Sequence, residues 1–279
     1  MRSSVLAVLA VLVLAANARP QTVPAPSFEV ASIKPAAPDA RGMFIRPGPG
    51  GGVSITNMSL KDLIGFAWSV QPFQITGGPP WLDKLRFDIV AKSDSPIAPT
   101  QMNAMLQGLL KDRFQLVVTQ ENKESSIYAI VLARKDGKLG PQLTETTEAS
   151  CKAFDPKNPP PPAAGSPRPN YCGNIGTNGR SLSAYARQIS DLSPLLSRLL
   201  GRTVIDKTGL TAKYDIQLNW TPDDNQSLAA APPGPNAPND AAGGSIFTAF
   251  QEQLGLKLVG QKGPVEMIVV QSADKPSEN

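Results

Sequence analysis

The chain has 279 residues, 41% hydrophobic and 18% charged, which is enough to bury a core in one large domain or two small ones. Its formal net charge is only +4, without a dense lysine or arginine run, and this argues against nucleic-acid binding. Histidine is absent, which excludes a Ser-His-Asp or Cys-His hydrolase of the usual kind and an HExxH zinc site.

Residues 1–18 have the pattern of a secretory signal peptide. Arg2 supplies the positive charge, residues 5–16 form an apolar run, and Ala16-Asn17-Ala18 is a small-x-small cleavage site. The apolar run is too short to cross a bilayer comfortably. We therefore expect cleavage after Ala18, no stable membrane span in the mature protein, and export to the periplasm or the extracellular space. An uncleaved membrane anchor is the alternative.

Residues 27–140 predict a first α+β unit. One amphipathic helix is expected after a cap at Asn57 or Ser59, and a second after a cap at Thr100. The Pro/Gly-rich residues 35–52 predict a surface loop. Strands are expected at residues 27–34, 53–55, 73–76, 86–92, 114–118 and 127–132, the last two paired as a hairpin.

Residues 181–279 repeat this order. Ser181 is expected to open a helix as Ser59 does, with a kink or break at Pro194. Gly255 is expected to end the second helix of this unit, which Ser245 caps. Strands are expected at residues 203–206, 214–220, 256–259 and 265–270, the last two again as a hairpin. Residues of about 222–244, rich in proline and alanine, predict a disordered insert.

Residues 141–180 predict a proline-rich connector that is closed by a disulfide. Cys151 and Cys172 are the only cysteines, and an oxidising compartment favours a bond between them. Two free buried thiols are the alternative. With no histidine and no third cysteine, a metal site is not expected.

The two units therefore predict an α+β fold made by internal duplication, with two tandem β-α-β-β-α-β-β copies. The triplet Phe87-Asp88-Ile89 in the first unit recurs as Tyr214-Asp215-Ile216 in the second. Short hairpins favour mostly antiparallel sheet, and amphipathic helices favour packing on one face of it. The sequence leaves open whether the two copies share one sheet.

The chain from Ser27 to Asn279 resembles the "soil-associated protein" family of exported soil-bacterial proteins, a domain of unknown function. The residues that carry this resemblance are Phe28–Pro35, Ser59–Ile64, Met105–Phe114, Val204–Leu210, Gln253–Leu256 and Lys275–Asn279. The resemblance implies export and an ordered domain of this length, and it brings no cofactor and no catalytic residue. Similar domains that follow membrane sensor-peptidase modules imply a sensing or binding role at the envelope. The element order is also similar to the short N-terminal domains of secretins and TonB-dependent receptors, which implies a role in assembly at the envelope.

Four residues are candidates for binding: Trp81, Asp206, Lys207 and Thr208. A buried Asp206–Lys207 pair could exchange protons, because a desolvated lysine titrates near neutrality. The alternative is that Asp206 accepts turn hydrogen bonds while Lys207 faces solvent. Trp81 follows a Gly-Gly-Pro-Pro turn, where it could stack on a sugar or peptide or pack in the core.

Asp88 and Asp215 occupy equivalent places in the two units. Two carboxylates across a pseudo-dyad would suit a hydrolase. Strand alternation, however, places both side chains on the solvent face, which argues for an ordinary surface role.

The sequence favours an exported, non-catalytic module that binds a peptide, protein or glycan at the cell envelope. The expected binding modes are a peptide strand added to a sheet edge and a groove between the copies. The alternatives are an envelope assembly component resembling secretin N-domains and a histidine-free hydrolase that uses carboxylates and lysine. No cofactor is expected.

Overall fold

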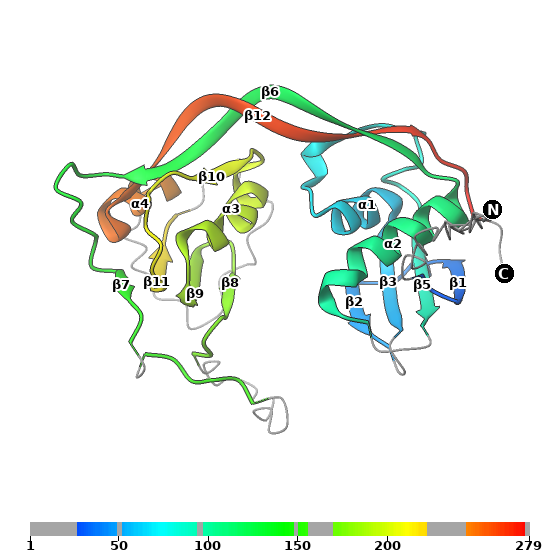
Figure 1. Ribbon diagram of the computed structural model, residues 1–279, viewed down its shortest axis with the longest axis horizontal. Coiled ribbons are helices and arrows are strands. Elements are labelled where there is room, and N and C mark those ends of the chain that lie inside the picture. Colours follow the sequence, from blue (N-terminus) through cyan, green and yellow to red (C-terminus); the bar gives the residue numbers. More distant parts are fainter. Residues whose placement is uncertain are drawn as a thin grey trace, which may run out of the picture.

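The computed structural model describes residues 27–48, 52–93, 97–147, 150–155, 170–221 and 244–276. These residues form two lobes joined by a long two-stranded β-ribbon (Figure 1). They contain four α-helices and three mostly antiparallel four-stranded sheets. None of the described helices is long and apolar enough to cross a membrane. The expected signal peptide and nearly all of the expected insert lie outside the described residues.

The first lobe has an antiparallel sheet that is covered by two helices. The strand order is β1 (Val30–Pro35), β5 (Arg86–Lys92), β3 (Val53–Ser59) and β2 (Phe44–Pro47). The helices are α1 (Leu60–Trp68) and α2 (Pro99–Phe114). They lie between this sheet and the ribbon (Figure 1), and side chains from all three layers form the core.

The second lobe has a sheet with the corresponding strand order. It runs β7 (Leu143–Glu145), β11 (Tyr214–Asn219), β9 (Ser181–Arg187) and β8 (Ile175–Thr177). Helices α3 (Ser193–Leu200), which a 3-10 turn at Ile189–Leu192 precedes, and α4 (Ile246–Leu254) belong to this lobe. The four strands of each sheet can be numbered by their order in the chain. In both lobes, their order across the sheet is then first, fourth, third, second.

The ribbon consists of β6 (Val117–Leu132) and β12 (Leu256–Ser272), which pair antiparallel over most of their length. Each lobe adds a short parallel strand to it: β4 (Ile75–Gly77) pairs with β12, and β10 (Val204–Asp206) pairs with β6. The resulting sheet, in the order β10-β6-β12-β4, is shared by both lobes. β12 supplies Ile268 and Val270 to the core of the first lobe, and β6 supplies Ile130 to the core of the second.

Local signals in the sequence account for several helix ends. The Ser59 hydroxyl accepts the N–H of Asp62 at 3.1 Å, and the Asp62 carboxylate accepts the N–H of Ser59 at 3.0 Å, so the predicted cap at Ser59 is confirmed. Gly255 ends α4 with φ 68°, as predicted. Helix α2 begins one residue before Thr100, with Pro99 in its first turn and Ala98 as the N-cap.

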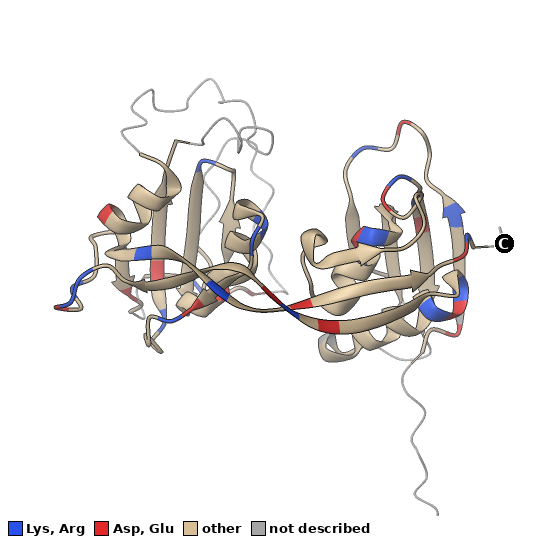
Figure 2. Cartoon of the chain, turned by 90° about the horizontal axis from the view of Figure 1, so that it is seen from above, with Lys and Arg blue, Asp and Glu red and all other residues tan. Residues whose placement is uncertain are grey.

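Both predicted hairpins are wrong. Residues 117–132 form one continuous strand, and so do residues 256–272. The polar stretch at residues 121–126, which looks like a turn, is the part of the ribbon that passes between the lobes. Figure 2 shows that acidic and basic residues occur along this crossing, where a two-stranded ribbon has few neighbours to pack against.

Two further predictions need correction. Residues 181–187 form strand β9 and not the start of a helix, because Leu182 and Ala184 alternate into the core with Ser183 exposed between them. The predicted loop at residues 35–52 contains the short strand β2. Strand β2 pairs with β3 and completes the sheet of the first lobe.

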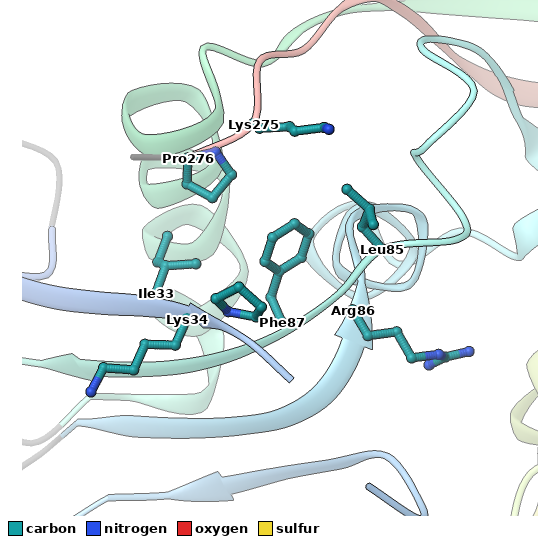
Figure 3. Close-up of a pocket in the computed structure, with 8 residues that line it drawn as sticks. Ile33, Lys34, Leu85, Arg86, Phe87, Lys275 and Pro276 are labelled. Atoms are coloured by element: carbon teal, nitrogen blue, oxygen red, sulfur yellow. The ribbon is translucent and has the colours of Figure 1, made fainter. Parts of the chain in front are cut away.

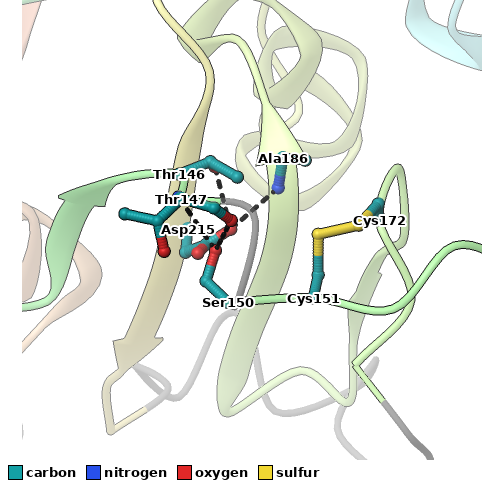
Figure 4. The surroundings of a disulfide bond; sticks show 7 residues. All are labelled: Thr146, Thr147, Ser150, Cys151, Cys172, Ala186 and Asp215. Atoms are coloured by element: carbon teal, nitrogen blue, oxygen red, sulfur yellow. Dashed lines mark hydrogen bonds between the residues drawn. A yellow bond between two sulfur atoms is a disulfide. The ribbon is translucent and has the colours of Figure 1, made fainter.

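The predicted disulfide is confirmed: Cys151 is bonded to Cys172 (Figure 4). Next to it, Lys152 and Tyr171 form an isolated parallel bridge, and the ring of Phe154 packs edge-on against Tyr171 at 5.4 Å between centroids. The bond therefore fixes the two ends of the connector between β7 and β8 against each other.

Candidate functional site

Strand β1 offers an open sheet edge in the described part of the chain, where only β5 pairs with it. The N–H of Ala36 donates to the carbonyl of Arg86 at 2.9 Å, in the register of the β1–β5 pair. Backbone groups alternate in direction along an antiparallel strand. The N–H and C=O groups of Ala31 and Ile33, and the carbonyl of Pro35, therefore point to the open side.

A cavity of about 150 Å³ lies at the C-terminal end of β1. Figure 3 shows the Phe87 ring between Ile33 of β1, Leu85 and Pro276. The apolar lining residues are Ile33, Pro35, Leu85, Phe87 and Pro276, and the charged ones are Lys34, Arg86 and Lys275. The pocket is therefore an apolar hollow bordered by three cations.

The walls of this pocket are anchored in the core of the first lobe. Phe87 is 5% exposed and packs edge-on against Phe114 at 5.2 Å and against Trp81 at 6.4 Å between ring centroids. The N–H of Asp274 donates to the carbonyl of Phe114 at 2.7 Å, which holds the C-terminal segment beside the pocket. A hollow built in this way exists before a ligand arrives.

The cations surround the mouth of the pocket and do not enter it. The guanidinium of Arg86 donates to the carbonyl of Asn57 at 2.8 Å and lies 3.6 Å from the Asp62 carboxylate. In Figure 3 it points away from the pocket, and the ammonium of Lys34 points away on the other side. The Lys275 side chain extends along the rim near Leu85.

The structure does not bring the four sequence candidates together. Trp81 lies in the first lobe, half-buried behind the pocket floor. Asp206 is the last residue of β10 in the second lobe, and Lys207 and Thr208 follow it in the turn. The Asp206 carboxylate accepts the N–H and the hydroxyl of Thr208, both at 2.8 Å, and the Lys207 ammonium donates to the Gln261 side-chain oxygen at 3.3 Å. These contacts stabilise the turn and tie it to the ribbon.

The expectation that Asp88 and Asp215 lie freely on the solvent face is wrong. Both residues are half-buried. The Asp88 carboxylate accepts the N–H of Asn57 at 2.8 Å. The Asp215 carboxylate accepts the N–H of Ala186 at 2.9 Å and the hydroxyl of Thr146 at 3.0 Å (Figure 4). The two aspartates belong to different lobes, so they do not form a carboxylate pair.

Sequence reasoning missed the pocket because its walls come from three distant segments. These are residues 33–35, 85–87 and 275–276. The first and third segments fall in stretches that carry the family resemblance. That resemblance was the signal in the sequence that could have pointed to the pocket. In the described residues, no group of three cysteine or carboxylate side chains is placed to hold a metal ion.

Comparison with known proteins places the chain in a family. Residues 61–273 match the family model described as "Protein of unknown function (DUF3738)". This match includes Leu85–Phe87 and begins after β1. No curated protein and no solved structure matched the chain. Because the match covers more than half of its length, the chain belongs to the DUF3738 family of proteins of unknown function.

Proposed function

We propose that this protein is an exported, non-catalytic module that binds an extended segment of a partner protein at the open edge of β1. The observation that carries the proposal is the apolar pocket beside a strand edge that no strand of the described residues pairs with. In strand addition, backbone hydrogen bonds supply affinity, and pockets for alternate side chains supply specificity. Both elements lie at the same end of the first lobe.

The size of the pocket suits one side chain of the partner. At about 150 Å³, it is smaller than the sites that enclose drug-sized ligands. A residue of the added strand that faces the same way as Ile33 would meet Leu85, Phe87 and Pro276. Leucine, isoleucine and phenylalanine are the side chains whose burial there stabilises most.

Export to the envelope is part of the proposal and rests on two features. Residues 1–18 have the pattern of a signal peptide, and Cys151–Cys172 is a disulfide of the kind that persists in oxidising compartments. The resemblances to the soil-associated proteins and to the N-terminal domains of secretins and TonB-dependent receptors support the same location.

We also infer that the lobes are two copies of one unit that exchange their last strands. The support is the corresponding strand order of the two four-stranded sheets. Each lobe also has an aspartate that accepts the N–H of a residue with φ near 55°, Asn57 in one and Ala186 in the other. In each copy the helices would cover one face of the four-stranded sheet, and the exchanged strands would cover the helices.

A displayed library of random extended peptides, selected on the mature disulfide-intact protein, tests the binding role. Selected peptides should shift the backbone amide resonances of Ala31 and Ile33. Peptides with alternate amides N-methylated should lose binding, since they cannot donate to the β1 edge.

Matched variants separate the pocket from the rest of β5. Leu85→Trp fills the pocket and should weaken the selected peptides at least tenfold. Val90→Trp, within β5 at a side chain that is 51% exposed, should leave binding unchanged. Equal binding by the N-methylated peptides, or resonance shifts confined to other surfaces, would contradict strand addition.

A further inference from the structure

We infer that the partner segment carries a large apolar residue directly adjacent in sequence to an acidic residue. This inference rests on the proposed function and specifies the chemistry of its partner. It follows from the alternation of β1 and from the charges around the pocket.

Neighbouring residues of β1 face opposite sides of the sheet. Ile33 is 2% exposed and lines the pocket, whereas Lys34 is exposed and its ammonium points away from the pocket (Figure 3). A strand added along β1 has the same alternation, because side chains of paired strands share faces. When one partner residue enters the pocket, its sequence neighbour lies beside Lys34.

A partner residue across the open edge from Lys34 would bring its side chain close to that of Lys34. Its own backbone groups point to β5, in the register set by the Ala36–Arg86 hydrogen bond. The position across the open edge is therefore a non-hydrogen-bonded one, where paired side chains come closest. An acidic side chain there would face the Lys34 ammonium.

The charge of Lys34 is available for such a contact. Its cross-strand neighbour on β5 is Asp88, whose carboxylate accepts the N–H of Asn57. Among the described residues, neither Lys34 nor Lys275 forms an ion pair. The described residues that line the pocket include no carboxylate. The local field therefore favours an anionic neighbour of the apolar anchor and disfavours a cationic one.

Four capped peptides on one threonine-rich background test this chemistry. They carry Leu-Glu, Leu-Gln, Leu-Lys or Ala-Glu at the same two central positions, and their affinities are measured by titration calorimetry at low ionic strength. Each step from Leu-Glu to Leu-Gln to Leu-Lys should weaken binding by about 1.5- to 5-fold. Ala-Glu should bind at least tenfold more weakly than Leu-Glu, since the pocket is left unfilled.

A charge reversal identifies the residue responsible. Lys34→Glu should invert the order so that Leu-Lys binds better than Leu-Glu. Lys92→Glu, at the far end of the β1–β5 pair, should keep the original order. Thermal unfolding of both variants confirms that they are folded.

The possible results separate the two levels of the proposal. If Leu-Glu, Leu-Gln and Leu-Lys bind equally, or if Lys34→Glu leaves their order unchanged, the inference about partner chemistry is overturned while strand addition stands. If none of the four binds and the peptides selected from the library are insensitive to N-methylation, the proposed function itself fails.

Discussion

At the scale of single residues, Asp88 and Asp215 hold two backbone irregularities in place. Asn57 and Ala186 have φ values of 56° and 54°, a left-handed conformation that disfavours residues with a Cβ. Each donates its N–H to a carboxylate on the neighbouring strand. The pairing register of β3 and β9 shifts close to these positions, so the carboxylates stabilise bulges.

Asp215→Ala should lower the free energy of unfolding by about 2 kcal/mol, because hydrogen bonds to a charged acceptor are lost and the Ala186 N–H is left without its partner. Denaturant titration followed by circular dichroism measures the loss. Asp39→Ala, at an exposed turn position, is the control and should stay within about 0.5 kcal/mol of the original protein. Equal effects of the two substitutions would contradict the role of Asp215.

Because of Tyr214, the free energy of unfolding should fall at alkaline pH. Burial raises the pKa of Tyr214 above its ordinary value, and the Glu145 carboxylate, its cross-strand neighbour, adds to the shift. A pKa that is raised in the folded state means that the unfolded chain loses the proton first. The contribution of protonated Tyr214 to the free energy of unfolding is therefore complete below a pH of about 10. This contribution is lost as the pH rises through the folded-state pKa.

Urea titrations between about pH 8 and pH 11 measure this effect. Tyr214→Phe should show a shallower decline of the unfolding free energy over that range. All other side chains are common to the two proteins, so the difference between their pH profiles isolates Tyr214. Parallel pH profiles would show that Tyr214 does not contribute.

At the scale of elements, β4 and β10 fasten the lobes to the ribbon, and each has a left-handed glycine at or after its end. Gly77 is the last residue of β4, and Gly209 lies in the turn after β10. Gly77 and Gly209 both have φ 75°. Their surroundings differ: a Cβ added at Gly77 would lie 2.6 Å from the carbonyl oxygen of Val270, whereas one added at Gly209 meets nothing within 4 Å. Gly77 therefore permits close approach of β4 to β12 as well as the turn.

This difference makes the two glycines a matched pair. Gly209→Ala should cost about 1 kcal/mol of stability, from its backbone conformation alone. Gly77→Ala should cost roughly 1–3 kcal/mol more, because the methyl group must displace the backbone of β12. Chemical denaturation of both variants measures the two costs, and similar values would mean that the β4–β12 contact yields easily.

At the scale of the whole molecule, the ribbon makes the two halves of the chain depend on each other. Every pair of the β6–β12 ladder joins residues more than 120 positions apart in the sequence, such as Ile130 and Leu258. The core of each lobe includes side chains from a strand of the other half. Separation of the halves would expose this apolar surface and break the ladder.

Cleavage at a protease site placed between residues 156 and 169 tests this dependence. After reduction of Cys151–Cys172, the two fragments should still elute together from a gel-filtration column, because the ladder and the shared cores hold them. Denaturing conditions serve as the control and should separate the fragments. Elution as two independently folded lobes would show that the ribbon contributes little to the association.

Several features could be predicted because their causes are local. The cap at Ser59, the glycine that ends α4, the alternation of β5 and β11, and the disulfide all depend on residues close in sequence or on the chain having only two cysteines. The coarse fold, with mixed helices and mostly antiparallel strands, follows from the same patterns. For these features the residue types and their spacing are sufficient.

The ribbon and the pocket were decided only by tertiary structure. An apolar stretch, a polar stretch and a second apolar stretch are equally compatible with a hairpin and with one long strand that joins two cores. Only the distance between the lobes distinguishes these two alternatives. The pocket depends on sheet pairing that brings residues 33–35 beside 85–87, and on the Asp274–Phe114 hydrogen bond that places residues 275–276 there. Such long-range pairing depends on which surfaces remain to be covered after the local elements form, and no local pattern in the sequence records that.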